Sequence, residues 1–206
     1  MKVLLINGSP NEHGCTYTAL SEIEKTLIEE KVNAEIVHIG TKPIRGCIGC
    51  GNCAEENRCV FKDDIVNVML DKMEDSDGLI IGSPVYYASA NGSLICLLDR
   101  MFYAGNCFAH KPAAAVVSAR RAGTTASIDE LNKYFTIAQM PIVSSSYWNM
   151  VHGNTPEEVR RDSEGMQTMR NLARNMAWLL KCIACGKENE LSVPNNEYNN
   201  RTNFIR

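Results

Sequence analysis

Short apolar runs alternate with longer amphipathic stretches, and this alternation constrains the fold more than any other feature of the chain. Strands are expected over residues 2–6, 34–39, 77–82, 112–118 and 141–145. Helices are expected over residues 16–31, 65–73, 92–104, 124–138 and 156–184. Several of the strands are apolar throughout, as parallel strands covered on both faces usually are. The sequence therefore predicts one doubly wound α/β domain with a five-stranded parallel sheet, spanning residues 1–206.

The charge balance and the length of the apolar runs exclude several classes of protein. Lys and Arg total 21 against 24 for Asp and Glu, a net charge of −3, so the chain lacks a general basic surface for DNA or RNA. The apolar runs are too short to cross a bilayer, and the N-terminus has no signal-peptide pattern. We expect a cytoplasmic protein that binds neither nucleic acid nor membrane.

The loop expected after the first strand, Asn7 to Thr16, carries groups that suit a phosphate monoester. Ser9 and Thr16 supply hydroxyls, Gly14 supplies flexibility, and the start of a helix supplies backbone N–H groups. The loop contains neither G-x-G-x-x-G nor G-x-x-x-x-G-K-[ST], so the dinucleotide and triphosphate fingerprints are absent. On its own, this loop is equally consistent with a plain turn and helix cap.

Two further loops follow buried strands and are expected at the same edge of the sheet. Residues 82–92 place a proline and two tyrosines where a planar ligand can lie, although tyrosines also often simply pack a loop. Residues 118–124 add cationic side chains and a glycine, although two adjacent arginines are commonly solvated surface. A ligand at this edge is therefore a hypothesis that rests on all three loops together.

Together these loops resemble those of the NADPH-dependent FMN reductase family, a branch of the flavodoxin-like fold. The resemblance covers roughly residues 1–145 and rests on Asn7-Gly8-Ser9-Pro10…Gly14-Cys15-Thr16, on Gly82-Ser83-Pro84-Val85-Tyr86-Tyr87 and on Leu98-Asp99-Arg100. It implies FMN as cofactor and a flavodoxin-like fold. It also implies that the phosphate is surrounded by Ser9, Asn11, Cys15 and Thr16. The isoalloxazine would be lined by Pro84, Val85, Tyr86 and Tyr87, and on its other side by the 118–123 loop with Ser118, Arg120 and Gly123.

Cysteine is the one unusual residue type, with nine in the chain. Within a Cys-rich loop at 44–60, Cys47, Cys50, Cys53 and Cys59 form C-x2-C-x2-C-x5-C, a spacing able to wrap one 4Fe–4S cluster. Zinc fits less well, because structural zinc sites usually take two separated cysteine pairs. The motif resembles that of the iron–sulfur flavoproteins; the alternative is four reduced thiols packed at a subunit interface. For Cys182 and Cys185, we expect packing at the end of the last helix.

The function predicted from these features is an FMN-dependent electron-transfer oxidoreductase that couples FMN to a 4Fe–4S cluster. No catalytic side chain is assigned, because the flavin performs the chemistry. NAD(P)H or reduced ferredoxin is the expected donor, with a small molecule or a protein as acceptor. Two alternatives stay open: a cluster-free NAD(P)H-dependent FMN or quinone reductase, and a non-enzymatic flavodoxin-like carrier or FMN-binding module.

The last third of the chain favours self-association. The expected helix at 156–184 is strongly apolar, and a C-terminal tail at about 187–206 is rich in Asn and too polar to fold alone. A surface of this kind is commonly covered by a second copy of the chain in closed symmetry. We therefore expect a homodimer or a homotetramer.

Overall fold

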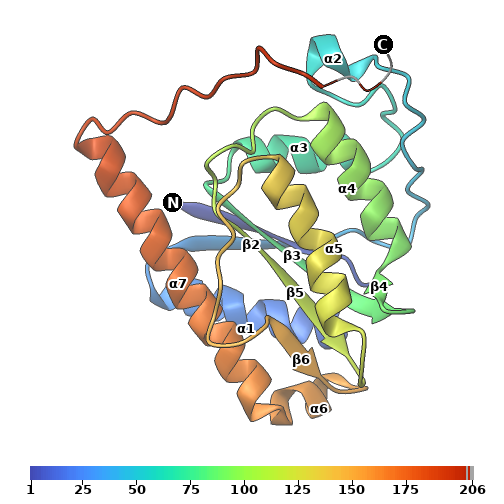
Figure 1. The fold of residues 1–206 in the computed structure, drawn as a ribbon. Coiled ribbons are helices and arrows are strands. Elements are labelled where there is room, and N and C mark those ends of the chain that lie inside the picture. The colour runs from blue at the N-terminus through green and yellow to red at the C-terminus, as the bar shows by residue number, and fades with distance from the viewer. Residues whose placement is uncertain (203, 205–206) are drawn as a thin grey trace.

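Five parallel strands form the central sheet of the computed structural model, which describes residues 1–202 and 204 (Figure 1). They run in the order β2-β1-β3-β5-β6, with the bounds Asn33–His38, Lys2–Asn7, Gly78–Tyr86, Ala113–Ala119 and Met150–His152. A sixth strand, β4 (Ser89–Ala90), pairs antiparallel with the end of β3 and was not predicted. The strand order is that of flavodoxin, and the direction of winding reverses between β1 and β3. The predicted fold class is confirmed.

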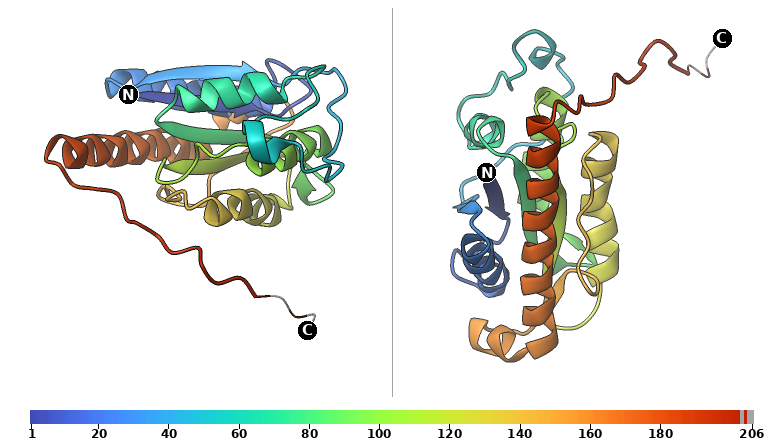
Figure 2. Two further views of the ribbon diagram at one scale, coloured as in Figure 1. Left: turned by 90° about the horizontal axis from the view of Figure 1, so that it is seen from above. Right: turned by 90° about the vertical axis from the view of Figure 1, so that its left-hand side faces the viewer.

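Helices cover both faces of this sheet (Figure 2). One face carries α1 (Cys15–Glu29) and α7 (Ser163–Glu188). The other face carries α3 (Val66–Glu74), α4 (Gly92–Ala104) and α5 (Thr124–Ile137). Two short helices, α2 (Cys53–Glu56) and α6 (Pro156–Arg161), lie outside these layers.

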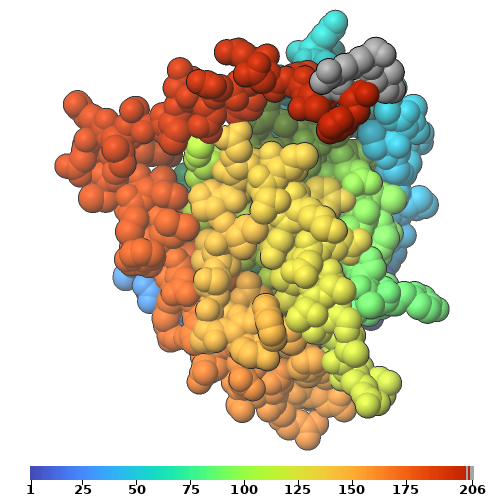
Figure 3. All heavy atoms as spheres, in the orientation of Figure 1, coloured from blue at the N-terminus to red at the C-terminus, as the bar shows by residue number. Residues whose placement is uncertain are grey.

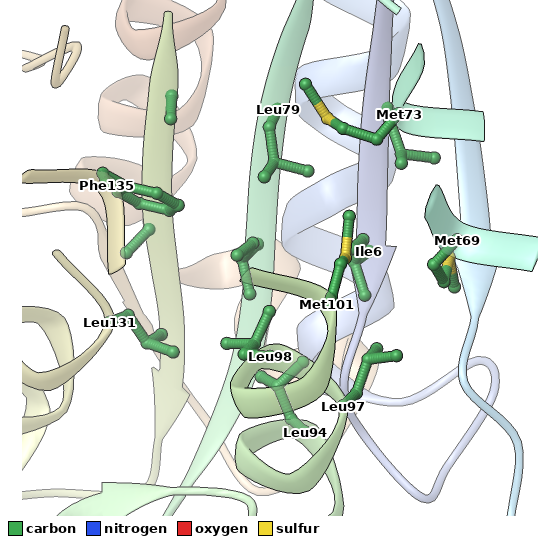
Figure 4. Close-up of a cluster of buried hydrophobic side chains, with 14 of the residues drawn as sticks. Ile6, Met69, Met73, Leu79, Leu94, Leu97, Leu98, Met101, Leu131 and Phe135 are labelled. Carbon is green, nitrogen blue, oxygen red and sulfur yellow. The ribbon is translucent and has the colours of Figure 1, made fainter. Parts of the chain in front are cut away.

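The strands contribute to two separate cores because their side chains alternate between the two faces. Leu4 and Ile6 of β1 point to the face of α3, α4 and α5, whereas Val3 and Leu5 point to that of α1 and α7. Figure 4 shows the first core, in which Ile6 and Leu79 lie among apolar side chains of α3 and α4. This two-sided burial is the physical reason for the unbroken apolar runs in the sequence.

Three expected elements differ from the observed ones. The strand predicted at 77–82 does not end at Ser83-Pro84 but continues to Tyr86, so the first part of the expected 82–92 loop belongs to β3. The strand predicted at 141–145 is reduced to one isolated bridge between Ile142 and Ala113, and the edge strand lies later, at β6. The helix predicted over 156–184 is interrupted at Asp162, which separates α6 from α7. The Asp162 carboxylate accepts hydrogen bonds from Gly165 N at 2.9 Å and from His152 N at 2.7 Å. It thereby caps α7 and ties this helix start to β6.

The apolar face of α7 packs within its own chain. Met169, Leu172 and Met176 are fully buried in the core formed with α1 and the sheet. The apolar pattern that suggested self-association is thus explained by packing of α7 against α1 and the sheet of its own chain. The homodimer or homotetramer stays a prediction.

The last part of the chain follows α7 and includes the expected tail. Residues 191–202 form no helix or strand, are exposed throughout, and lead from the end of α7 across the top of the view in Figure 3 and away from the sheet and its helices in Figure 2. Tyr198 and Asn196 are hydrogen-bonded there to the side chain of Gln139, just after α5. Residues 203, 205 and 206 of the expected tail lie outside the described residues. Within the described part of the chain, every helix is too short or too polar to cross a bilayer.

Candidate functional site

The three predicted loops meet at the carboxyl edge of the sheet. Gly8 N donates to Gly82 O at 2.8 Å, which joins the loop after β1 to the middle of β3. The hydroxyls of Thr16 and Ser118 are 2.8 Å apart, which joins the start of α1 to the end of β5. This edge is where open α/β sheets of this topology bind their ligands.

The loop after β1 is a compact turn held by its own side chains. Ser9 N donates to Asn7 Oδ1 at 3.1 Å, and Asn11 N donates to Ser9 Oγ at 3.1 Å. Helix α1 follows with Gly14 as its N-cap residue, no capping side chain and no acidic residue in its first turn. The N–H groups and the dipole of this helix end therefore favour an anion, with no carboxylate of that turn competing for the position.

The four residues predicted around a phosphate lie on this loop and helix start, in different environments. Ser9 and Thr16 are buried, Cys15 is half-buried and Asn11 is exposed. Burial raises the pKa of the Cys15 thiol, and its Sγ lies 3.7 Å from Gly153 O. A neutral thiol at this position does not repel an anion.

The second loop is a tight hairpin between β3 and β4. Pro84 and Val85 are half-buried, whereas Tyr86 is 44% exposed and Tyr87 is fully exposed. Tyr87 and Ala88 adopt φ values of 52° and 61°. Positive φ is uncommon for residues other than glycine, so the surrounding structure must hold this tip in place.

The third loop packs against that hairpin tip. Gly123 has φ 90°, and a Cβ added there would lie 2.7 Å from the Cα of Ala88, so only glycine fits. Ser118 is buried at the end of β5, and Arg120 is exposed. The structure therefore brings Ser118 and Gly123 to the other two loops, while the Arg120 side chain extends into solvent.

Three residues that shape these loops were missed from the sequence. Asn91 Nδ2 donates to Gly8 O at 2.7 Å, and Asn91 Oδ1 accepts from Ser93 N at 3.0 Å at the start of α4. His38 Nε2 lies 2.7 Å from Ser9 O. Glu130 accepts hydrogen bonds from the hairpin between β3 and β4. Only Asn91 had a local signal, because Asn directly before a predicted helix is a preferred cap.

The four cysteines of the predicted cluster motif line one hollow, here called the cysteine hollow. Cys47 and Cys50 are exposed, and Cys53 and Cys59 are half-buried. The walls are completed mainly by side chains of α4 and of the segment after the last cysteine, including Phe61, Arg100, Tyr103 and Ala104. All four thiols thus border the same partly apolar space.

The donor set of the cysteine hollow fits a 4Fe–4S cluster, which is held by four Cys thiolates. Across residues 1–202 and 204, no three His, Cys, Asp or Glu side chains stand close enough to hold a single metal ion. Each thiolate of a cubane binds a different iron, so its four sulfurs do not need to converge on one atom. The residue types and their shared hollow therefore suit the cluster better than they suit one zinc ion.

The cysteine hollow and the three loops at the carboxyl edge of the sheet, here called the strand-end loops, lie at different ends of α4. Asn91 begins the helix at the carboxyl edge of the sheet, whereas Arg100, Tyr103 and Ala104 of the hollow lie in its second half (Figure 1). Arg100 comes nine positions after Asn91, which corresponds to about 13 Å along the helix axis. The chain thus carries two neighbouring candidate sites rather than one.

The remaining cysteine pair lies elsewhere, on α7. Cys182 and Cys185 are both exposed, so the expectation that they pack at the end of the helix is wrong. They lie on the outward part of α7, because the face that packs on the sheet is formed by Met176 and Leu180.

Comparison with known proteins agrees with this architecture. Residues 1–155 match the NADPH-dependent FMN reductase family. An iron–sulfur flavoprotein of Methanocaldococcus jannaschii is 33% identical over 192 residues, covering 89% of this chain and 99% of that protein. One of Methanosarcina thermophila is 28% identical over 189 residues, covering 89% and 97%. A solved archaeal flavodoxin shares the fold with a TM-score of 0.60 at 14% identity, over 88% of this chain and 99% of that one. The chain therefore belongs to the NADPH-dependent FMN reductase family, in the group of the iron–sulfur flavoproteins.

Proposed function

We propose that this protein is an FMN-dependent electron-transfer oxidoreductase whose FMN works with a 4Fe–4S cluster. One observation carries the proposal: all four motif cysteines surround one hollow beside α4. This helix begins at the three loops at the carboxyl edge of the sheet, where the flavin is expected to bind. The full-length relatives described as iron–sulfur flavoproteins support the same assignment.

The strand-end loops support FMN as the bound flavin. The start of α1 offers backbone N–H groups, and the paired Thr16 and Ser118 hydroxyls add donors beside it, a set that suits a terminal phosphate. Pro84, Val85, Tyr86 and Tyr87 would line the isoalloxazine, and the Ser118–Gly123 loop would lie on its other side. Ser9, Asn11, Cys15 and Thr16 would surround the phosphate.

Bound FMN supplies the redox chemistry, since it exchanges electrons with both one- and two-electron partners. The role of the protein is to bind and orient the cofactors and to determine how a donor approaches them. The exposed rings of Tyr86 and Tyr87 stand where a donor such as NAD(P)H or reduced ferredoxin would approach. A small molecule or a second protein would then take the electrons.

A cluster-free NAD(P)H-dependent reductase is the second candidate. It is favoured by one observation, the exposure of Cys47 and Cys50 at the open side of the cysteine hollow. In that case the cysteines would stay reduced thiols and the flavin alone would pass electrons to an acceptor.

Anaerobic purification with flavin and iron analysis tests both candidates. We expect one FMN per chain, about four iron and four sulfide, and broad visible absorption beneath the flavin bands. A Cys50→Ser variant should lose iron and keep FMN. Protein that binds FMN but takes up no iron on anaerobic reconstitution would favour the cluster-free reductase, and protein that binds FAD or no flavin would contradict both.

A further inference from the structure

Arg100 is a buried cation that meets one of the motif cysteines. Its side chain is 1% exposed, and both Nε and Nη2 lie 3.2 Å from Cys59 Sγ. Its Nη1 donates to the carboxylate of Asp64, which is also nearly buried. A buried guanidinium needs partners for all its N–H groups, and here a sulfur receives two of them.

The same guanidinium joins the two ends of the cysteine segment. Nη1 of Arg100 also lies 3.3 Å from Arg45 O, just before the first motif cysteine, while Cys59 is the last one. The ring of Phe61 lies close to both arginines, with its centroid 4.3 Å from Arg45 Cζ and 5.5 Å from Arg100 Cζ. The loop is therefore fixed at both ends to α4 through one side chain.

Cys59 is the most firmly held of the four motif cysteines. Its N–H donates to Asn67 Oδ1 at 2.9 Å, and its carbonyl accepts from Asn67 Nδ2 at 2.9 Å. With the two contacts from Arg100, both its backbone and its sulfur have fixed partners. Cys47 and Cys50, in contrast, stand exposed on the open side of the hollow. Cys59 is thus oriented before any iron is bound.

We propose that Arg100 is a positioning residue for the cluster, which holds Cys59 as the preformed ligand and donates two hydrogen bonds to its sulfur after iron is bound. This inference rests on the proposed function, because it assigns a role toward the cluster that the cysteine hollow would hold. A partner that orients a ligating side chain commonly matters nearly as much as the ligand itself.

Two physical consequences follow from these hydrogen bonds. Cluster retention increases, because Cys59 loses no orientational freedom when iron binds. The reduction potential of the cluster also rises, because N–H donors and a buried positive charge stabilise the more electron-rich reduced state. The carboxylate of Asp64 offsets part of the positive charge of Arg100. The specific contribution of Arg100 to the cluster potential therefore comes from its directed N–H···S hydrogen bonds.

Two variants and one matched control isolate this role. Arg100→Lys keeps the charge but replaces the planar fork by one ammonium group. Arg100→Gln combined with Asp64→Asn removes both charges of the buried pair, and the new amide still offers an oxygen to Val66 N, which in the wild type donates to Asp64 Oδ1. Arg58→Lys is the control, since Arg58 precedes Cys59 directly but donates to the carboxylates of Asp71 and Glu74.

Three measurements on anaerobic, FMN-loaded and iron-reconstituted protein test the role of Arg100. They are the rate of iron loss to a chelator, the cluster potential by dye-mediated titration, and the thermal unfolding temperature. Both Arg100 variants should lose iron at least tenfold faster than wild type. At the wild-type midpoint potential, the ratio of reduced to oxidised cluster should fall about tenfold in the charge-free double variant, which corresponds to a potential about 59 mV lower. Arg58→Lys should match wild type in both.

The results separate this inference from the function on which it depends. Arg100 variants that retain iron and potential like Arg58→Lys, while wild type carries four irons, would overturn the inference alone. A lowered unfolding temperature with an unchanged potential would do the same, because it would mean a purely structural role. Wild type that takes up no iron would overturn the cluster assignment and the inference together.

Discussion

The hydroxyls of Thr16 and Ser118 lie 2.8 Å apart, and together they connect two loops that are 102 residues apart in the chain. Both residues are almost fully buried. Each hydroxyl has one hydrogen to donate, and the mutual bond uses only one of the two. The other is available to an acceptor at the start of α1, which is the position proposed for the FMN phosphate.

We therefore expect Thr16→Val and Ser118→Ala each to weaken FMN binding about tenfold, since a hydrogen bond to a charged group contributes roughly 1.5 kcal/mol. The double variant should lose little more than either single one, because the two hydroxyls act as a unit. Thr26→Val is the control: Thr26 is a buried threonine of the same helix, bonded only within the helix to Glu22 O. Fluorescence titration of cofactor-free protein measures all four, and fully additive losses would contradict the shared role.

The sheet could be predicted because buried strands have a simple physical signature. In the middle of the sheet, strands such as Val3–Ile6 must be apolar at every position, since neighbouring side chains enter different cores. The edge strand could not be found in this way. Pro141 O and Val143 N are hydrogen-bonded to Ala113, which gives this apolar segment a strand-like pattern, yet regular pairing occurs only at Met150–His152.

A second prediction concerns the reactivity of the cysteines. In iron-free protein at pH 8, Cys47 and Cys50 should react with iodoacetamide at least tenfold faster than Cys15 and Cys107, because the thiolate is the nucleophile. Burial raises the pKa of the Cys15 and Cys107 thiols, whereas Cys47 and Cys50 are exposed. Mass spectrometry of peptides over a time course gives the separate rates.

Iron reconstitution should then protect one set of cysteines and leave another reactive. Cys47, Cys50, Cys53 and Cys59 should become unreactive once a cluster forms. Cys182 and Cys185 serve as the internal control, since they are exposed on α7, away from the cysteine hollow. Protection of Cys182 and Cys185 together with the motif cysteines would point to general aggregation instead of a specific cluster.

A third prediction links Tyr134 to stability at high pH. Burial, together with the hydrogen bond from Tyr134 OH to Asp99 Oδ1 at 2.5 Å, raises the pKa of this phenol above its usual value of about 10. Above pH 10 the unfolded chain therefore releases the phenolic proton while the folded chain keeps it. The contribution of Tyr134 to stability is complete below pH 10 and decreases as the pH rises further.

Denaturant unfolding between pH 9 and 11 measures this dependence. The free energy of unfolding should fall less steeply with pH in Tyr134→Phe than in wild type. Tyr103→Phe is the control, because Tyr103 is 65% exposed. Equal slopes for wild type and Tyr134→Phe would show that the phenol titrates alike in the folded and unfolded chains.

The candidate site was less predictable than the sheet, because its supports come from distant positions. The residues on the loops themselves follow from local motifs such as Ser9 and Thr16. In contrast, Glu130 and His38 are hydrogen-bonded to loops more than 25 residues away in the chain. No local sequence motif identifies either residue. The two contacts from Arg100 to Cys59 likewise depend on how α4 packs against the cysteine loop.

A fourth prediction tests how Glu130 supports the hairpin. Its carboxylate accepts from Ser89 Oγ at 2.7 Å and from Ala90 N at 2.8 Å, just after the strained turn at Tyr87 and Ala88. Glu130→Ala should loosen the hairpin and weaken FMN binding by about 1–2 kcal/mol, since the backbone donor loses its partner. Adding Ala88→Gly should restore part of the folded stability, because glycine adopts positive φ without strain. Full affinity in Glu130→Ala would show that Glu130 is not what holds the hairpin in its flavin-binding conformation.

The fifth prediction concerns Asn91, whose side chain joins two loops and a helix. Its Oδ1 caps α4 by accepting from Ser93 N, and its Nδ2 donates to Gly8 O in the loop after β1. Asn91→Asp keeps the cap but places a carboxylate oxygen against the Gly8 carbonyl, so two acceptors face each other in a buried position. We expect a loss of about 1–3 kcal/mol in unfolding free energy and a clear loss of FMN affinity.

Asn91→Ser separates the two roles of this side chain. Serine also caps helices well, but its short side chain leaves Gly8 O without the amide donor. FMN affinity should then fall in both variants, whereas stability should fall more in Asn91→Asp, where the buried repulsion is added. Denaturant unfolding and flavin titration on the same samples give both quantities. If Asn91→Ser binds FMN as tightly as wild type, the hydrogen bond from Asn91 to Gly8 is not what holds the loop after β1 in its binding conformation. The hydrogen bond from Gly8 N to Gly82 O would then be sufficient to hold it.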